Sequence, residues 1–514
     1  MAASNTQVLE FDRWDGGEFG SIAPDLAAEG TFTGSNVVVY RDGHIGPRPG
    51  LKLADIGEDL PNGPLQGFGF VPTPLDTEPS HWVIVQGDEV WSFRPSLVDA
   101  LQVDAGPDVT LTAPLADGEF VWWKESTRQL FGRVYFATSS GVYAVKMNTW
   151  EMEQITPDVT GTDIEIYKDR LFVASDTVAR TFYSDVADYD TWPVDGFFDS
   201  GASWPISHLA ELRDGLCIFT PGGNWLLTGG SPDTWVLRRV SDALPAIPNS
   251  IVKTNDDIYF TPSARNAPIM YNGSYGDELA LRNLENWKPL TSTVAGIQSY
   301  GNRDILFCSA SSELLWRKNM VWTKHEFAPE VDDEPVTVGP YLTRYFDDVV
   351  LIAANGDETT PPSFYFLMMD LNRPAFVGEP FSSPGDGSDT PVDAWFSLPD
   401  FFSQTGEEVR VRRVIVDFTK YDILNDDTNN ITCEVKGLAR FRHPGEDAAS
   451  TYTDSWTEAT TEGSADGIRD RAVFRGGGPN QFHGGFRLSL RALRGVKIDR
   501  ILVDYETQPY RPRS

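Results

Sequence analysis

The sequence predicts an all-β protein, with a β-propeller of six or seven blades followed by a C-terminal antiparallel β-sandwich or platform domain. Three observations predict this: a short apolar run that recurs about every 45 residues, an abundance of turn residues, and strict alternation near the C-terminus. The 45 glycines and 35 prolines among 514 residues favour many short strands over long helices. An apolar content of 40% supplies enough core material for two or three domains.

The repeat is an apolar run that follows a polar turn and leads into a second strand carrying an aromatic residue. The seven runs begin at Trp82, Val134, Leu171, Leu216, Ile258, Ile305 and Val349. The aromatic residues that follow them are Trp91, Tyr143, Tyr183, Trp225, Tyr271, Trp316 and Tyr365. A unit of this size forms a hairpin-bearing sheet too small to bury both of its faces, so the units must pack on one another as propeller blades do. A multi-sheet sandwich with regularly spaced hairpins is the alternative.

The domain boundaries follow from where the repeat begins and ends. Residues 1–60 are expected to form an N-terminal arm and hairpin that contacts the platform, and residues 61–380 the propeller. A segment rich in Pro, Gly, Ser and Asp indicates a linker over residues 381–395. Residues 396–514 alternate in polarity, as in the strand Phe486 to Arg491, and predict the sandwich.

The charge is distributed unevenly along the chain. Lys and Arg number 42 against 75 Asp and Glu, a net charge of −33. Residues 401–514 hold 17 of each sign, so the remaining 25 cations and 58 anions place the whole acidic excess in residues 1–400. This balance argues against a conventional nucleic-acid binder, which needs cations to displace phosphate counterions. Acidic side chains lining a channel would instead let duplex DNA slide without being trapped, and acids kept outside for solubility are the alternative.

The C-terminal cations are mostly arginines, which suit bidentate ion pairs at interfaces. The candidate subunit-interface residues are Arg410, Arg412, Arg413, Arg487, Arg491 and Arg494. We expect them to pair with carboxylates of a neighbouring subunit or of an adaptor protein. A solvated charged face is the alternative.

No residue pattern indicates an enzyme, a metal site or a cofactor. The six histidines are scattered singly, and no nucleophile elbow or phosphate-binding loop follows a strand. The Asp185, Asp188 and Asp190 cluster lacks the remaining ligands of a calcium loop and is interpreted as a solvated loop. The three cysteines are expected to be buried thiols. The sequence shows no signal peptide and no membrane-spanning run.

Several phrases resemble the tail nozzle or hub proteins of short-tailed bacteriophages, a group that includes the tail tubular protein B type and the packaged-DNA-stabilisation type. The phrases are DGHIGPRPGL (42–51), YSDVADYDTWP (183–193), LCIFTPGGNWLLTGGSPDTWVL (216–237), and IVKTNDDIYFTP with APIMYNG (251–273). The resemblance covers most of the chain, although no separate distal nozzle domain is expected at this length.

The resemblance implies a structural virion protein rather than an enzyme, made in the cytoplasm of a host bacterium. Such a subunit would join a homo-oligomeric ring, usually a hexamer, below the portal and adaptor ring proteins and above tail tip or fibre proteins. Double-stranded DNA would be retained in the channel and pass through it without sequence-specific binding. The alternative function is a carbohydrate-binding or glycoside-processing β-propeller with an accessory sandwich domain, against which stand the missing secretory signal and the missing repeated Asp-box.

Overall fold

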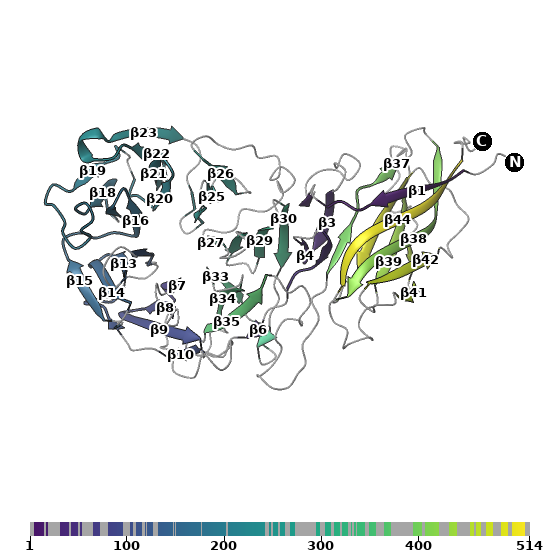
Figure 1. Cartoon of the computed structure of the whole chain (residues 1–514), viewed down its shortest axis with the longest axis horizontal. Coiled ribbons are helices and arrows are strands. Elements are labelled where there is room, and N and C mark those ends of the chain that lie inside the picture. The colour runs from purple at the N-terminus through teal and green to yellow at the C-terminus, as the bar shows by residue number, and fades with distance from the viewer. Residues whose placement is uncertain are drawn as a thin grey trace, which may run out of the picture.

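The computed structural model shows a chain built of antiparallel strands, which confirms the all-β prediction (Figure 1). It describes the strands and their tight turns between residues 5 and 508. The longer stretches outside the description are 19–30, 54–64, 72–80, 273–293, 356–363, 372–393, 421–430, 439–452 and 476–484, besides both chain ends and shorter segments. The expected linker therefore lies almost wholly outside the described residues.

Seven small sheets follow one another along the chain within the described residues. Sheet 1 contains β7 (Gly67–Val71), β8 (His81–Gln86), β9 (Glu89–Pro95), β10 (Val103–Ala105) and β11 (Val109–Thr110). Sheet 2 contains β12 (Trp123–Ser126), β13 (Arg133–Thr138), β14 (Gly141–Lys146) and β15 (Met152–Thr156). Sheet 3 contains β16 (Asp163–Tyr167), β17 (Arg170–Ala174), β18 (Arg180–Tyr183) and β19 (Phe197–Asp199). Sheet 4 contains β20 (His208–Leu212), β21 (Gly215–Thr220), β22 (Gly223–Thr228) and β23 (Val236–Ser241), with a short 3-10 helix at Pro232–Thr234.

The remaining three sheets complete this series. Sheet 5 contains β24 (Val252–Lys253), β25 (Ile258–Phe260) and β26 (Ile269–Tyr271). Sheet 6 contains β27 (Val294–Gln298), β28 (Ile305–Ser309), β29 (Glu313–Lys318) and β30 (Val321–Glu326). Sheet 7 contains β33 (Thr337–Arg344), β34 (Val349–Asn355), β35 (Phe364–Asp370) and β6 (Lys52–Leu53), and a two-stranded ribbon of β31 (Glu330–Val331) and β32 (Glu334–Pro335) precedes it. Strands β6 to β35 are called the circular unit, because the sheets lie around a circle in Figure 1.

The seven predicted hairpins are all present in the circular unit. Each predicted apolar run lies on the second strand of its sheet, and each predicted aromatic residue lies on the third. Hydrophobic clusters lie between neighbouring sheets rather than within one. Phe219 of sheet 4, for example, packs edge-on against Phe260 of sheet 5, with ring centroids 5.3 Å apart. Each sheet thus buries its faces against its neighbours, as the size of the repeat requires.

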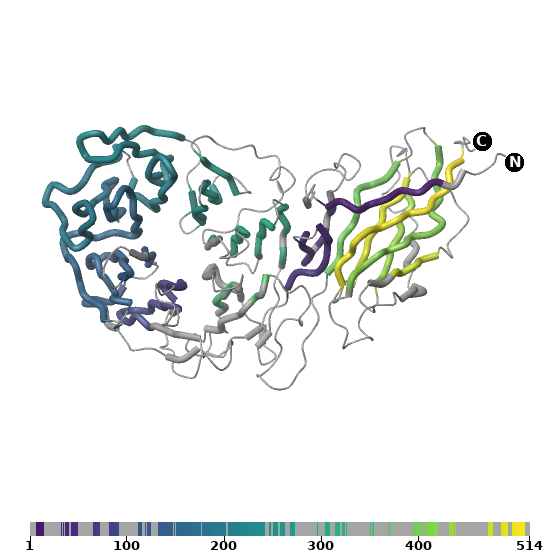
Figure 2. The backbone as a smooth tube through the Cα atoms, in the orientation of Figure 1, coloured from purple at the N-terminus to yellow at the C-terminus, as the bar shows by residue number. Residues whose placement is uncertain are grey.

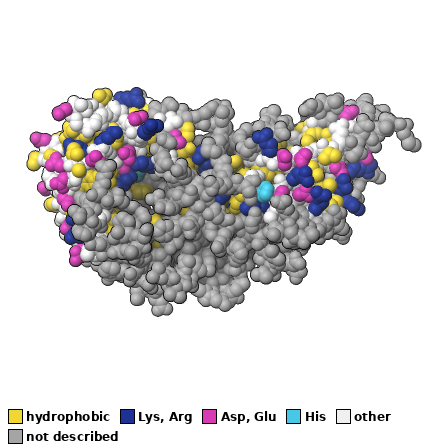
Figure 3. Space-filling view, in the orientation of Figure 1, with side chains coloured by type: hydrophobic (Ala, Val, Ile, Leu, Met, Phe, Trp, Pro, Cys, Tyr) yellow, Lys and Arg dark blue, Asp and Glu magenta, His cyan; other side chains and the backbone are white. Residues whose placement is uncertain are grey.

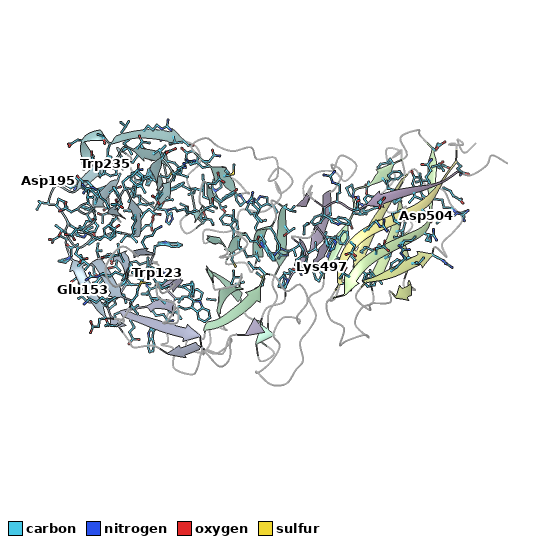
Figure 4. The ribbon with its side chains drawn as sticks, viewed as in Figure 1. Trp123, Glu153, Asp195, Trp235, Lys497 and Asp504 are labelled. Carbon is cyan, nitrogen blue, oxygen red and sulfur yellow. The ribbon has the colours of Figure 1, made fainter. Side chains whose placement is uncertain are left out.

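The first strands of the small sheets lie closest together. Sheets 1 and 2 approach so closely that a Cβ added to Gly69 of β7 would lie 2.2 Å from the indole Nε1 of Trp123 on β12. Glycine is required there because any side chain would displace the indole. In Figure 4, Trp123 lies toward the centre of the circle, whereas Glu153 and Asp195 lie on its outer rim.

The second part of the chain is the two-sheet unit. One sheet contains β1 (Asn5–Phe11), β4 (Val37–Val39), β5 (Ile45–Pro47), β38 (Glu408–Lys420), β41 (Ala459–Gly463), β42 (Arg469–Arg475) and β44 (Val496–Gln508). The other contains β2 (Gly17–Glu18), β3 (Thr31–Ser35), β36 (Trp395–Ser397), β37 (Phe401–Phe402), β39 (Thr432–Leu438), β40 (Thr453–Trp456) and β43 (Gly485–Arg491). One core cluster, which includes Phe396, Val414 and Leu490, is built from both sheets.

The N-terminal segment belongs to both parts of the chain. Strands β1 to β5 lie in the two-sheet unit, whereas β6 pairs with β35 through Leu53 and Leu367 and so joins sheet 7. Figure 2 shows this purple segment beside the yellow and green strands of the two-sheet unit. Val321 of β30, in sheet 6, belongs to the same core cluster as the two-sheet unit. The two parts are therefore joined by packing as well as by chain connections.

Candidate functional site: the arginine-bearing face of the two-sheet unit

A β-bulge places two consecutive arginines on one face of β38. The register pairs Val411 with Tyr505 and Arg413 with Asp504, so Arg412 is the extra residue of the bulge. Its Nη2 donates to Glu506 Oε2 at 2.6 Å, and Arg413 Nε donates to Asp504 Oδ2 at 2.7 Å. Both acceptors lie two residues apart on β44 and share a face. Without the bulge, the two guanidinium groups would point to opposite faces.

The other predicted arginines differ in how firmly they are held. Arg487 makes a bidentate pair with Asp400, at 2.5 Å from Nε to Oδ1 and 3.0 Å from Nη2 to Oδ2. The side chain of Arg491 is 60% exposed, and its Nε lies 3.9 Å from Glu434 Oε2. Its guanidinium also lies 5.8 Å from the centroid of the Trp395 ring.

The last two predicted arginines are Arg410 and Arg494. Arg410 lies opposite Glu506 in the β38–β44 register and is half-buried. Arg494 lies outside the described residues. Four of the predicted arginines have acidic partners within this chain: Arg412, Arg413, Arg487 and Arg491. Their pairing with a neighbouring subunit stays a prediction.

A charge network that the sequence did not predict lies on the same sheet. Asp417 accepts from Arg471 Nε at 2.6 Å through Oδ1, and from Arg500 Nη2 at 2.6 Å through Oδ2. Arg500 also donates to Glu10 Oε1 at 3.2 Å. The network crosses four strands, β42, β38, β44 and β1, and Figure 3 shows basic and acidic side chains interspersed over the two-sheet unit. Only pairing β1 with β44 brings residues 10 and 500 together, so no local pattern could have indicated it.

A buried cation–aromatic cluster lies where the circular unit meets the two-sheet unit. The ring of Tyr40, just after β4, has Lys318 Nζ of sheet 6 at 5.5 Å and Lys497 Nζ of β44 at 4.1 Å from its centroid. Lys318 Nζ also lies 3.3 Å from Asp304 Oδ2 and donates to the Leu371 carbonyl at 2.6 Å. Cations close to an aromatic face are attracted to its quadrupole, most strongly when desolvated. Figure 4 labels Lys497 at this junction.

Nearby, Arg48 and His325 are fully buried. Burial lowers the pKa of the Arg48 guanidinium to about 9. Burial, reinforced by the positive charge of Arg48, also lowers the pKa of His325 well below its usual value, so this imidazole is neutral at pH 7. Arg48 Nε donates to Asn36 Oδ1 at 3.0 Å, which holds it against the N-terminal segment.

Buried carboxylates of β16 hold the inner strands of sheets 2 to 5 together. Glu165 Oε1 lies 2.5 Å from Lys124 Nζ of sheet 2 and 3.9 Å from Lys253 Nζ of sheet 5. Asp163 Oδ2 accepts from the backbone N–H of Leu209 in sheet 4 at 2.5 Å. Burial alone would raise the pKa of Glu165, but the two ammonium groups outweigh it and lower that pKa. These contacts satisfy edge groups that an isolated sheet would leave unpaired.

The remaining predictions on site chemistry concern metals, thiols and membranes. Asp190 binds Arg133 at 2.9 Å and accepts from the Tyr135 hydroxyl, so the aspartate-rich loop docks on sheet 2. In the described part of the chain, no group of three or more His, Cys, Asp or Glu residues is placed to hold a metal ion. All three cysteines are buried and no disulfide joins them, as predicted. No described helix is long and apolar enough to cross a membrane.

Comparisons with known proteins return no family model and no curated protein that matches this sequence. Solved structures with some likeness include PorZ, an essential bacterial surface component of the type-IX secretion system of Porphyromonas gingivalis. It has 11% identity over 70% of this chain and 44% of PorZ, with a TM-score of 0.35. Raptor from Chaetomium thermophilum has 8% identity over 64% of this chain and 29% of Raptor, with a TM-score of 0.41. The chain spans less than half of either structure, and similarities this low do not bear on function.

Proposed function

We propose that the circular unit is a seven-bladed β-propeller and that the two-sheet unit is a β-sandwich acting as a platform. The support for seven blades is the order of contacts among inner strands: β20 contacts β24, β24 contacts β27, β27 contacts β33, and β33 contacts β7. The last sheet also takes in β6 from before the first sheet. A sheet built from both ends of the repeat holds a propeller closed, because opening it would break strand pairing.

We propose that the chain is a structural subunit of the tail of a short-tailed bacteriophage, a ring-forming nozzle or hub below the portal and adaptor. The single observation that carries this proposal is the shared N-terminal segment, since β1 to β5 build the platform and β6 completes sheet 7. A subunit that bears the pressure of packaged DNA needs parts that cannot move independently. The buried cluster around Tyr40 stiffens the same junction.

The location of the family-like phrases adds support to this proposal. The phrase over residues 42–51 contains both β5 and the buried Arg48, at the junction of the two parts. The phrase over residues 183–193 forms the loop that docks on sheet 2 through Asp190. Two of the four phrases thus include residues at contacts between sheets.

The glycoside-processing alternative has less support. A glycosidase needs a carboxylic acid with a raised pKa to protonate the leaving oxygen. The buried carboxylate Glu165 on the inner strands has its pKa shifted the other way by Lys124 and Lys253. This favours a structural role for that group.

The test is the mass and shape of the purified full-length chain. Light scattering after gel filtration should give a particle of six 57.0 kDa copies, about 340 kDa, and negative-stain images should show rings. The rings should attach to DNA-filled heads that carry portal and adaptor. A particle of one chain at every concentration, or hydrolysis of a glycan by the purified protein, would contradict the proposal.

A further inference from the structure

Strand β1 is an edge strand of its sheet. It pairs with β44 over seven residues, from Asn5 with Thr507 to Phe11 with Ile501. In the described chain, no other strand pairs with its second edge. Val8 is 62% exposed, and Leu9 and Phe11 are only partly buried against the core. An open edge with an exposed apolar residue is a site for pairing with another chain.

The segment after β1 combines a short exposed hinge with a firm anchor. Asp12 and Arg13 are exposed, whereas Trp14 is only 2% exposed. The Trp14 ring packs edge-on against Phe396, with centroids 5.4 Å apart. β1 could therefore leave β44 while the chain from Trp14 onward stays in place.

We propose that β1 is exchanged between copies of this chain, so that β1 of one subunit pairs with β44 of the next. This inference rests on the proposed function as a ring subunit. Because the copies are identical, exchange preserves every contact of the strand, including Tyr505 to Gln7 at 2.6 Å and Arg500 to Glu10 at 3.2 Å. Head-to-tail donation from each subunit to the next closes a ring when the rotation allows it.

The short hinge at Asp12 and Arg13 limits how two neighbouring subunits can be arranged. β1 spans about 24 Å at ~3.4 Å per residue, and the two hinge residues add little reach. The receiving β44 must therefore lie close to the donor's Trp14, so that two-sheet units are neighbours. Figure 2 shows β1 along the border of this unit, with the N-terminus at the end remote from the circular unit. The exchanged strand and the arginine-bearing face would then form one interface.

A pair of introduced cysteines shows directly whether β1 pairs with β44 of its own chain or of another copy. Val8 lies opposite Asp504 in the register. Opposite residues of antiparallel strands have Cα atoms about 4.5–5.5 Å apart, which lies within the range of about 4.4–6.8 Å that a disulfide spans, so oxidation of Val8→Cys/Asp504→Cys should form a disulfide. On a non-reducing denaturing gel, exchange predicts a ladder of covalent oligomers up to the ring number. The single variants Val8→Cys and Asp504→Cys should give no ladder, since the three native cysteines are buried.

Particle mass and the disulfide gel together distinguish strand exchange from ring formation. Particles of ring mass that yield only single-chain disulfides would overturn exchange while leaving the ring intact. Particles of single-chain mass would overturn the proposed function as well. If the first pair fails to fold, Glu10→Cys/Leu502→Cys samples the same pairing two residues further along.

A longer hinge gives an independent readout. Eight Gly and Ser residues inserted between Asp12 and Arg13 would let β1 reach either its own β44 or a neighbour's with less constraint. With the cysteine pair present, the ratio of disulfides within one chain to disulfides between chains should rise at least threefold. A ladder that the insertion leaves unchanged would contradict hinge-controlled exchange.

Discussion

Arg500 donates two hydrogen bonds to one oxygen of Asp417, from Nε at 3.1 Å and from Nη2 at 2.6 Å. Arg471 binds the other oxygen of the same carboxylate at 2.6 Å. Burial alone would raise the pKa of Asp417, but the hydrogen bonds from both arginines outweigh it and lower that pKa. The carboxylate thus joins β42, β38 and β44 as an ionised group.

The first prediction concerns stability against pH. A carboxylate whose pKa is lowered in the fold stabilises it above the unfolded pKa of about 3.9, and this contribution is lost as pH falls through the lower folded value. Asp417→Asn should therefore cost about 1–2 kcal/mol at pH 7. The difference from the natural protein should shrink progressively as pH falls below the ordinary carboxyl pKa of about 3.9. Thermal unfolding across this range measures it, with the exposed Asp195→Asn as the matched control. An equal loss at every pH would exclude the electrostatic cause.

The second prediction contrasts two glutamates bound to the same lysine. The Glu165 side chain is 4% exposed and the Glu211 side chain 39%, and both approach Lys253. Glu165→Gln removes a buried charge that pairs with Lys124 and should cost about 3 kcal/mol. Glu211→Gln should cost less than about 1 kcal/mol. Denaturant unfolding of the two variants provides the comparison, and equal losses would show that burial does not decide the effect.

The third prediction concerns the junction of the two units. Tyr40→Leu removes the aromatic face between Lys318 and Lys497 and should cost about 1–2 kcal/mol. Tyr40→Phe keeps that face and loses only the hydroxyl donated to the Pro47 carbonyl. Calorimetry should resolve two unfolding transitions for the Leu variant, since the units would be less strongly coupled. A single transition as sharp as in the natural protein would mean that this cluster does not couple them.

The fourth prediction ranks the arginines as interface residues. Arg491 is exposed and only loosely paired, so its guanidinium is available to a partner with little loss to the fold. Arg491→Ala should weaken ring formation at least tenfold without changing the unfolding temperature of the subunit. Arg487→Ala should lower that temperature, because its bidentate pair with Asp400 is lost. The exposed Arg238→Ala serves as control for both. Full-chain variants are needed, since a chain cut near residue 395 would lack most strands that β1 to β5 pair with.

The fifth prediction concerns DNA. With a net charge of −33, the assembled protein should not retain duplex DNA at about 150 mM salt, because few phosphate counterions would be released on contact. Filter retention or gel shift with a labelled duplex measures this. Tight binding at that salt would contradict an acidic channel lining. Neutralising acids that face the channel should slow DNA ejection.

The sequence determined the repeat and its strands. Alternation and turn residues are local, and each apolar run, such as those at Leu171 and Leu216, lies on the second strand of its sheet. The burial of Cys217 and Cys308 was likewise predictable from the apolar runs in which they lie. Local patterns suffice here because a strand needs only its own residues to set which side chains share a face.

Only the tertiary structure decided where the N-terminal segment goes and which charges meet. Residues 10 and 500 form an ion pair because β1 pairs with β44, and β6 pairs with β35 more than 300 residues later in the chain. The bulge at Arg412 reverses the face that alternation assigns to Arg413. Strand pairing and bulges depend on the partner strand, whose edge and register are set by packing across the whole domain.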